Sequence, residues 1–240
     1  MTLRYFVETP IAGDTALLGD AEAHHLAHVM RLKPGAEVVL FDGGGAEFTA
    51  RVERVGKRDV TLAVLARHEI DRELSREVTL LTALPRGDRQ KWLVEKAVEL
   101  GVARLVPLRT ERAVVQPEAG TCEKLRRAVI EASKQCRRNR LMQIGEPTTL
   151  AVAAAAVPTT TLRLLAEPGA AASLASFSAA LAAEPTRAVA FLIGPEGGCS
   201  EDEASAARAA GWRGVSLGAR ILRVETAGGV CATWAGLNSA

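Results

Sequence analysis

An apolar run at residues 188–193, followed at once by a glycine-rich loop, constrains the fold more than any other stretch of this 240-residue chain. Six consecutive apolar residues bounded by turn residues are typical of a buried parallel strand. The run ends at Gly194-Pro195, where the backbone can turn sharply or approach a ligand closely. Ser200 and Glu203 then have the spacing of a helix capping box. Strand, glycine loop and helix in this order predict an α/β domain with a ligand crevice at the carboxyl ends of its strands.

Acidic side chains crowd the start of the helix predicted after this loop, at Glu196, Glu201, Asp202 and Glu203. A pyrophosphate would normally occupy such a helix N-terminus, because free N–H groups and the helix dipole favour negative charge there. The carboxylates would repel it, so the pattern disfavours ATP and NAD. S-adenosylmethionine carries no phosphate and has a sulfonium cation, and we expect it to bind in preference.

The pattern of apolar residues changes near residue 72 and predicts two domains. Residues 1–72 are predicted to be β-rich, whereas residues 73–240 alternate strands and helices, which indicates an α/β domain with a largely parallel sheet. The charged stretch 67–76 is the predicted linker. In the first part we expect a helix at 20–31 and strands at 37–41, 47–55 and 59–66. In the second we expect strands at 78–84, 105–108, 162–166, 188–193 and 214–217, a helix capped by Asp88 and closed by Gly101, and helices at 123–137, 170–183, 201–210 and 224–237.

Cysteine usage and hydrophobicity limit the class of protein. The four cysteines, Cys122, Cys136, Cys199 and Cys231, form no CxxC pair, and no signal-like segment opens the chain. This pattern predicts reduced thiols in a cytoplasmic protein. With 48% hydrophobic residues the chain can bury a large core without disulfides or metals. Its most apolar windows are too short to span a bilayer, so we expect no membrane partner.

A basic stretch runs along residues 121–141. It holds seven basic residues against two acidic ones: Lys124, Arg126, Arg127, Lys134, Arg137, Arg138 and Arg140 against Glu123 and Glu131. Such a stripe is typical of a surface that contacts a phosphate backbone, although a solvated helix face is the alternative. Because arginine dominates and its planar fork favours phosphate and base contacts, we favour RNA binding.

Sequence blocks spread over nearly the whole chain carry a family resemblance. They are HHLAHVMRLKPGAEVVLFDGGG at 24–45, RGDRQKWLVEKAVELGV at 86–102, LVPLRTERAVV at 105–115, EASKQCRRNR at 131–140, GPEGG at 194–198 and SLGARILRVETA at 216–227. Together they resemble the trefoil-knotted (SPOUT) RNA methyltransferases, and within that class the enzymes that methylate N3 of a uridine in 16S ribosomal RNA. Ala219 stands where that family commonly has proline, and Cys199 where it commonly has a larger apolar residue.

The resemblance implies a fold and a function. The fold is α/β, with a small N-terminal PUA-like β-barrel that grips RNA (1–72) and a C-terminal trefoil-knotted methyltransferase domain (73–240). The cofactor is S-adenosylmethionine, the partner is 16S ribosomal RNA or the small ribosomal subunit, and the enzyme is a homodimer with its site between subunits. Two alternatives stay open: a knotted methyltransferase acting on another RNA position, such as a ribose 2′-hydroxyl, and a non-catalytic RNA-binding assembly factor.

The resemblance also suggests binding residues. The loops at 165–168, 192–198 and 217–222 are expected to enclose the methyl donor, with backbone groups and apolar walls. The predicted cofactor-binding residues are Leu165, Glu167, Gly194, Pro195, Glu196, Gly197, Gly198, Leu217, Gly218, Leu222 and Thr226. The predicted RNA-binding residues are His25, Arg31, Arg86, Arg89, Arg112, Arg137, Arg138 and Arg140.

Arg223 and Glu225 are the predicted catalytic residues. N3 of uridine bears a proton, so a cation that stabilises the developing uridine anion and a carboxylate that accepts the proton would both assist methylation. One segment supplies both charges. The alternative is an ion pair between these two residues that pins the last helix.

The remaining candidates for chemistry are weaker. His24 and His28 share a predicted helix face, but no third ligand lies at convincing spacing, so we expect no metal. Cys199 lies beside the glycine loop without an evident partner base, and we interpret it as a packing residue.

Overall fold

The computed structural model describes residues 3–118 and 120–239, and its contacts divide the chain into two compact units. The first unit consists of residues up to Glu73 together with Ser133–Leu141. The second consists of Leu74–Ala132 and Met142–Ala240. The chain therefore changes unit near the boundary expected at residue 72, but the short segment 133–141 also joins the N-terminal unit.

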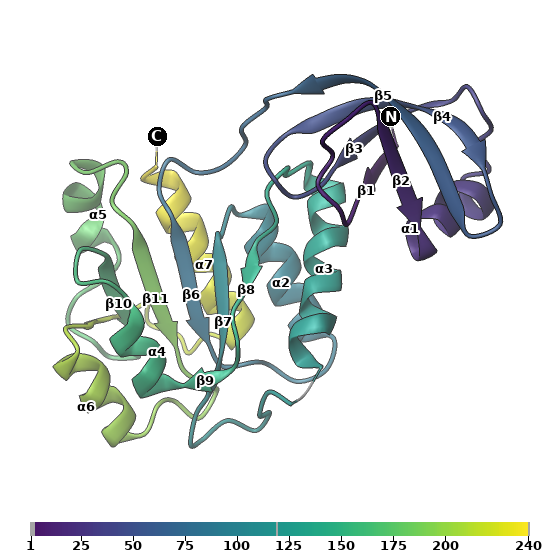
Figure 1. Cartoon of the computed structure of the whole chain (residues 1–240). Helices are drawn as coiled ribbons and strands as arrows, with labels where there is room; N and C mark the ends of the chain where they lie inside the picture. Colours follow the sequence, from purple (N-terminus) through teal and green to yellow (C-terminus); the bar gives the residue numbers. More distant parts are fainter. Residues whose placement is uncertain (1–2, 119, 240) are drawn as a thin grey trace. The chain divides into compact units, whose positions relative to one another are not determined.

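The N-terminal unit is built on a five-stranded sheet in the order β1-β3-β4-β5-β2 (Figure 1). The strands are β1 (Arg4–Phe6), β2 (Thr15–Gly19), β3 (Glu37–Phe41), β4 (Glu47–Val55) and β5 (Asp59–His68). The pair β1–β3 is parallel and the other neighbours are antiparallel. Alternate side chains such as Leu18, Leu40 and Leu62 bury one face of this sheet. Within the described part of the chain the edge strands β1 and β2 do not pair with each other, so the sheet is a half-barrel and not a closed barrel.

The helix expected at 20–31 is shorter and irregular. A single α-helical stretch, α1 (Asp20–His24), passes into a π-helix, η1 (His25–Val29). The Met30 N–H donates to the His25 carbonyl five residues earlier, at 2.9 Å. Arg31 then takes a positive φ of 53°, which ends the helix.

The second unit is a parallel α/β sheet in the order β12-β10-β11-β6-β7-β8, with β9 pairing with β7. The strands are β6 (Val78–Thr82), β7 (Arg104–Arg109), β8 (Gln143–Ile144), β9 (Thr148–Thr149), β10 (Leu162–Ala166), β11 (Val189–Ile193) and β12 (Arg213–Val215). Ala166 pairs with Ile193 and with Val215, so β10, β11 and β12 end at one edge of the sheet. The loops that follow these three strands therefore meet at that edge, which is where an open α/β sheet binds its ligand.

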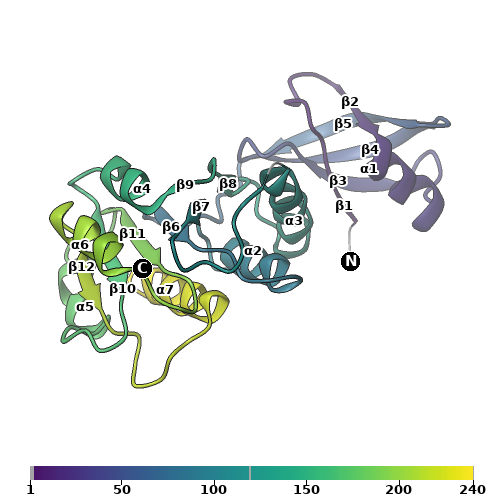
Figure 2. The ribbon, with the colours of Figure 1, turned by 90° about the horizontal axis from the view of Figure 1, so that it is seen from below.

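Helices cover both faces of this sheet (Figure 2). They are α2 (Arg89–Glu99), α3 (Thr121–Cys136), α4 (Leu150–Ala156), α5 (Ala175–Ala182), α6 (Glu201–Ala209) and α7 (Val224–Leu237). On one face, Leu150 of α4 and Ala207 of α6 pack with Leu81 and Leu192 of the sheet. On the other face α7 packs against α2, and Gly228 lies close to Leu93 and Leu80.

Three expectations for this unit need correction. The helix expected at 170–183 begins only at Ala175, because the Ala172 carbonyl instead accepts the Ser216 N–H at 2.8 Å. Asp88 is the N-cap of α2 but makes no capping bond with its side chain, since it is itself in the αR conformation. Arg76, in the predicted linker, is 2% exposed and donates to the Leu181 carbonyl at 3.1 Å, so this part of the stretch is a buried anchor.

Candidate cofactor and substrate site

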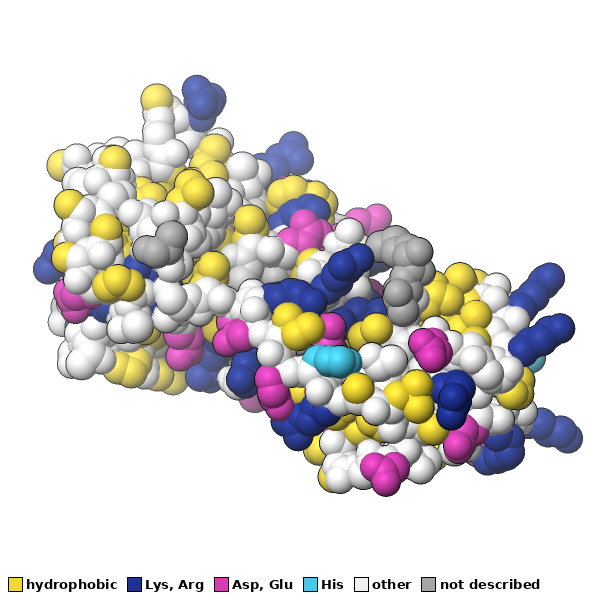
Figure 3. All heavy atoms as spheres, turned by 90° about the horizontal axis from the view of Figure 1, so that it is seen from above, with side chains coloured by type: hydrophobic (Ala, Val, Ile, Leu, Met, Phe, Trp, Pro, Cys, Tyr) yellow, Lys and Arg dark blue, Asp and Glu magenta, His cyan; other side chains and the backbone are white. Residues whose placement is uncertain are grey.

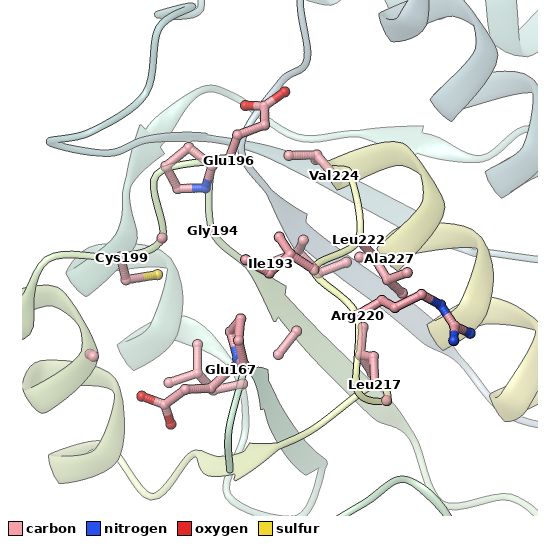
Figure 4. Close-up of a pocket in the computed structure, with 18 of the residues that line it drawn as sticks. Glu167, Ile193, Gly194, Glu196, Cys199, Leu217, Arg220, Leu222, Val224 and Ala227 are labelled. Carbon is pink, nitrogen blue, oxygen red and sulfur yellow. The ribbon is translucent and has the colours of Figure 1, made fainter.

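A cavity of about 210 Å³ opens where β10, β11 and β12 end (Figure 4). The three loops expected to enclose the methyl donor all contribute to it. Leu165, Ile193 and Leu222 form apolar walls, while Glu167, Glu196, Glu201 and Arg220 add charges. An apolar cavity with a few polar groups, at the carboxyl edge of a parallel sheet, is the usual form of a small-molecule site.

Most of the predicted cofactor residues line this cavity. Leu165, Glu167, Gly194, Pro195, Glu196, Gly198, Leu217, Gly218 and Leu222 do so, whereas Gly197 and Thr226 are absent from its walls. Thr226 is exposed, because its position in the first turn of α7 faces away from Val224 and Ala227, which line the cavity. The sequence analysis missed Val224 and Ala227, since apolar positions next to a helix start carry no distinctive signal.

Gly194 is the position at which the cavity loop most needs a glycine. A β-carbon at Gly194 would lie 2.7 Å from Cys199 Sγ and 3.1 Å from the Cys199 backbone nitrogen. The Gly198 N–H donates to the Pro195 carbonyl at 2.8 Å, which closes the turn. The loop therefore folds back tightly on itself, and its shape depends on the missing side chain.

The capping box at the start of α6 forms as predicted. The Ser200 N–H donates to Glu203 Oε2 at 2.9 Å, and the Glu203 N–H donates to Ser200 Oγ at 3.3 Å. Glu203 also accepts the backbone N–H of Glu111 at 2.9 Å. The chain's own groups therefore satisfy two of the N–H donors at this helix start, which leaves fewer of them for a phosphate.

The charges at the cavity favour a cationic ligand without phosphate. Of the lining residues, Glu167, Glu196 and Glu201 are acidic and Arg220 is basic. Arg208 lies 2.9 Å from Glu167 Oε1 and balances that carboxylate outside the cavity. Glu196 and Glu201 also have arginine neighbours, Arg89 at 3.6 Å and Arg208 at 3.9 Å. Because acidic residues outnumber the basic one in the wall, the cavity fits a sulfonium-bearing nucleoside better than a pyrophosphate.

Cys199 lines the cavity, but its thiol is poorly reactive. Burial, together with the nearby carboxylates of Glu203 and Glu167, raises the pKa of Cys199 to about 11. A thiol with this pKa is protonated at neutral pH, and the thiolate is the nucleophilic form. This agrees with a packing role.

Arg223 and Glu225 do not form the ion pair considered as the alternative. Arg223 is exposed at the N-cap of α7, and none of the ion pairs within residues 3–118 and 120–239 joins it to Glu225. The partner of Glu225 is Arg89 of α2, whose Nη1 lies 3.5 Å from Glu225 Oε1. The side chain of Glu225 is only 8% exposed, and its Oε2 is buried without a hydrogen-bond partner.

The predicted RNA-binding residues fall into two groups. Arg31, Arg86, Arg137 and Arg140 are exposed. Arg138 is a correction: it is 4% exposed and its guanidinium is bound by Glu73 within the N-terminal unit, so it is not offered to a phosphate. On the face seen in Figure 3, basic and acidic side chains of the N-terminal unit alternate and do not form one continuous patch.

The other predicted RNA-binding residues have contacts within the protein. Arg112 donates to the carbonyl oxygens of Gly197 and Cys199, each at 3.3 Å, and so braces the cavity loop. Arg89 pairs with Glu225 as described. His25 is half-buried against Tyr5, with ring centroids 5.8 Å apart and its Nδ1 without a hydrogen-bond partner. All three side chains therefore have contacts within the protein, in addition to any contact they make with RNA.

His24 and His28 lie together, with ring centroids 4.8 Å apart. Among residues 3–118 and 120–239, no group of three or more His, Cys, Asp or Glu side chains is placed to hold a metal ion. In the same part of the chain, no helix is both long and apolar enough to cross a membrane.

A parallel α/β sheet with an acidic, apolar-walled cavity at its carboxyl edge, in a chain that also contains a separate β unit, is typical of an α/β enzyme with an additional binding domain. Residues 72–236 match the RNA methyltransferase domain family, and residues 18–65 match the RNA methyltransferase PUA domain family. The chain therefore belongs to the RNA methyltransferase family, as the resemblance predicted.

Individual relatives agree with this assignment. A protein of Synechocystis named "Ribosomal RNA small subunit methyltransferase E" is 34% identical over 89% of this chain and 70% of its own length. A protein of that name from Neisseria gonorrhoeae, solved with S-adenosylmethionine, is 30% identical with a TM-score of 0.87, covering 97% of this chain and 95% of that one. A methyltransferase of Legionella pneumophila, also solved with this cofactor, is 29% identical with a TM-score of 0.88, covering 97% and 96%. The second unit thus has the SPOUT α/β fold, the trefoil-knotted class that the resemblance implied.

Proposed function

We propose that this enzyme transfers a methyl group from S-adenosylmethionine to N3 of a uridine in 16S ribosomal RNA. The observation that carries the proposal is the cavity at the ends of β10, β11 and β12, which has apolar walls and more acidic than basic residues. The relatives named as small-subunit methyltransferases, and the two similar structures that hold S-adenosylmethionine, support the choice of cofactor and of ribosomal RNA.

The cofactor and the protein have separate tasks in this reaction. S-adenosylmethionine, when bound, supplies the methyl group from its sulfonium, whose carbon–sulfur bond breaks as the carbon–nitrogen bond forms. The loops after β10 and β11 and before α7 hold the cofactor, mainly through backbone groups and the walls Leu165, Leu217 and Leu222. Glu225 accepts the proton that leaves N3, and Arg223 stabilises the developing negative charge on the uracil. Positioning of the base against the methyl donor provides much of the acceleration.

The N-terminal unit and the exposed arginines bind RNA in this proposal. The PUA family match supports RNA binding by this unit, and Arg31, Arg86, Arg137 and Arg140 are free to contact phosphates. We further propose that the enzyme works as a homodimer, as the resemblance implies, on 16S RNA or the small ribosomal subunit. Its compartment is then the cytoplasm, where that substrate is found.

Nucleoside analysis tests the proposal directly. 16S RNA from cells lacking this protein is incubated with the enzyme and labelled S-adenosylmethionine, digested and analysed by mass spectrometry. N3-methyluridine is the expected product. A ribose-methylated nucleoside would instead establish a different RNA position, and cofactor binding without any product would favour an assembly factor.

Arg223→Lys tests the assigned anion stabilisation. The lysine keeps the charge but loses the planar fork, so the single-turnover rate should fall roughly a hundred- to thousand-fold, about 3–4 kcal/mol. Because Arg223 is exposed and unpaired within the described residues, the unfolding midpoint should stay near that of the wild type. A wild-type rate would remove Arg223 from the mechanism.

A further inference from the structure

Glu225 has one carboxylate oxygen that nothing in the described protein satisfies. Its Oε1 lies 3.5 Å from Arg89 Nη1, while its Oε2 is buried and has no hydrogen-bond partner. Leaving a buried acceptor unsatisfied is destabilising, and more so when the group is charged. Next to a binding site, a ligand that brings a hydrogen-bond donor would satisfy it.

The position of Glu225 indicates which ligand brings that donor. Val224 and Ala227 flank it in the first turn of α7 and both line the cofactor cavity, whereas Glu225 does not. Since residues one position apart point about 100° apart around a helix, the carboxylate lies beside the cavity and not within it. In the proposed reaction the methyl acceptor is the ligand that the cofactor cavity does not itself hold.

Arg89 connects this carboxylate to the cofactor loop. The same Nη1 atom lies 3.6 Å from Glu196 Oε1, and Glu196 lines the cavity. At 3.5 and 3.6 Å these contacts are charge pairings and not short hydrogen bonds. One guanidinium thus lies between two carboxylates, one from the glycine loop and one from the first turn of α7, and it holds the carboxylate of Glu225 in place.

We propose that Glu225 selects uracil by accepting its N3–H, and that Arg89 is the positioning residue that holds the carboxylate for this contact. This inference rests on the proposed function and adds the basis of base selection to it. Cytosine has a lone pair at N3 instead of a hydrogen, so its N3 and the carboxylate repel each other. A site built to receive a hydrogen from the correct substrate rejects an analogue that lacks it by roughly 10⁴–10⁵-fold.

The experiment uses two RNA oligonucleotides that span the methylated uridine, one with uridine and one with cytidine at that position. Single-turnover rates, and dissociation constants in the presence of S-adenosylhomocysteine, are measured for both. The wild type should favour the uridine RNA strongly in both measurements. Glu225→Gln should lower the uridine rate and reduce the uridine-to-cytidine ratio at least a hundredfold, because the amide can donate to cytosine N3.

Variants of Arg89 test its positioning role. Arg89→Met should lower the uridine rate with little change in RNA affinity, and Arg89→Lys should recover part of the rate because it restores the charge. Lys91→Met is the matched control, since Lys91 is an exposed cation on the same helix and, within residues 3–118 and 120–239, its ion pair is with Glu95 of that helix, at 3.7 Å. It should leave rates and ratio unchanged. The unfolding midpoint of each variant is measured to show that the variant is folded.

The outcomes distinguish failure of the base-selection inference from failure of the proposed function. Wild-type discrimination in Glu225→Gln, with N3-methyluridine still made by the wild type, would overturn the selection role alone. Equal rates for Arg89→Lys and Arg89→Met would overturn the positioning role. A wild-type product other than N3-methyluridine would defeat the proposed function itself, and the base-selection inference with it.

Discussion

The Arg208 guanidinium lies 2.9 Å from the Glu167 carboxylate, which is directed away from the apolar centre of the cavity although Glu167 stands in the loop that ends β10 (Figure 4). Arg208 belongs to α6, so the pair ties the loop after β10 to the helix after the glycine loop. The carboxylate of Glu167, one of the predicted cofactor-binding residues, thereby has its partner within the protein.

Glu167→Gln should therefore change cofactor affinity little. The ion pair is partly exposed, and such pairs are worth about 0–1 kcal/mol, so the dissociation constant should change by less than about fivefold. Calorimetric titration with S-adenosylmethionine measures this. A loss of affinity of two orders of magnitude would mean that Glu167 turns into the cavity and contacts the cofactor directly.

Gly194→Ala should weaken S-adenosylmethionine binding at least tenfold, since its β-carbon would lie 2.7 Å from Cys199 Sγ and force the loop to move. Adding Cys199→Ala should recover only part of the affinity, because the Cys199 nitrogen at 3.1 Å remains. Gly229→Ala in α7 is the control: a β-carbon there meets nothing within 4 Å, so affinity should not change. Wild-type affinity in Gly194→Ala would show that the loop tolerates a side chain.

Arg137→Gly should reduce RNA affinity without loss of stability. Arg137 has a φ of 67°, so glycine removes the charge and also relieves backbone strain of about 1 kcal/mol. If Arg137 contacts a phosphate, the slope of log affinity against log salt should decrease by about 0.7–0.9, as measured by filter binding over a salt series. Unchanged affinity and slope would leave Arg137 as a solvated residue.

Arg138→Ala should lower the stability of the protein, in contrast to Arg137→Gly. Its guanidinium is buried with Glu73, and removal of one partner of a buried pair costs about 3–5 kcal/mol of stability. The denaturant midpoint should therefore fall. A surface role for Arg138 would leave the midpoint unchanged.

Cys199 should resist alkylation until the pH is high. Burial, Glu203 and Glu167 raise the pKa of Cys199 to about 11, so its thiolate at pH 8 is about a hundredfold scarcer than that of an unperturbed cysteine. Because the folded pKa lies above the unfolded value of 9.0, this group's contribution to stability is present below pH 9 and is lost as pH rises towards 11. Peptide mass spectrometry after iodoacetamide treatment from pH 7 to 10 measures the reactivity. Rapid labelling of Cys199 at pH 8 would contradict the assigned burial.

Local sequence patterns were sufficient for several elements of the second unit. The strand β10 and the helix α7 have the predicted bounds, and the capping box at Ser200 forms as expected. A continuous apolar run, a cap and a glycine turn each act over a few neighbouring residues, so these features can be recognised without knowledge of the fold. The approximate site follows from the same patterns, because the ends of parallel strands meet at one edge.

Tertiary contacts decided the remainder, because they join residues that are far apart in the sequence. The Ser216 N–H donates to the Ala172 carbonyl, so α5 begins only at Ala175, although the alanine run favours a longer helix. Arg138 is buried in an ion pair with Glu73, although the stretch of sequence around it has the composition of an RNA-binding surface. Glu225 pairs with Arg89, 136 positions away, and not with Arg223 two residues before it. Charge and periodicity report which side chains are available, whereas their partners depend on how distant segments pack.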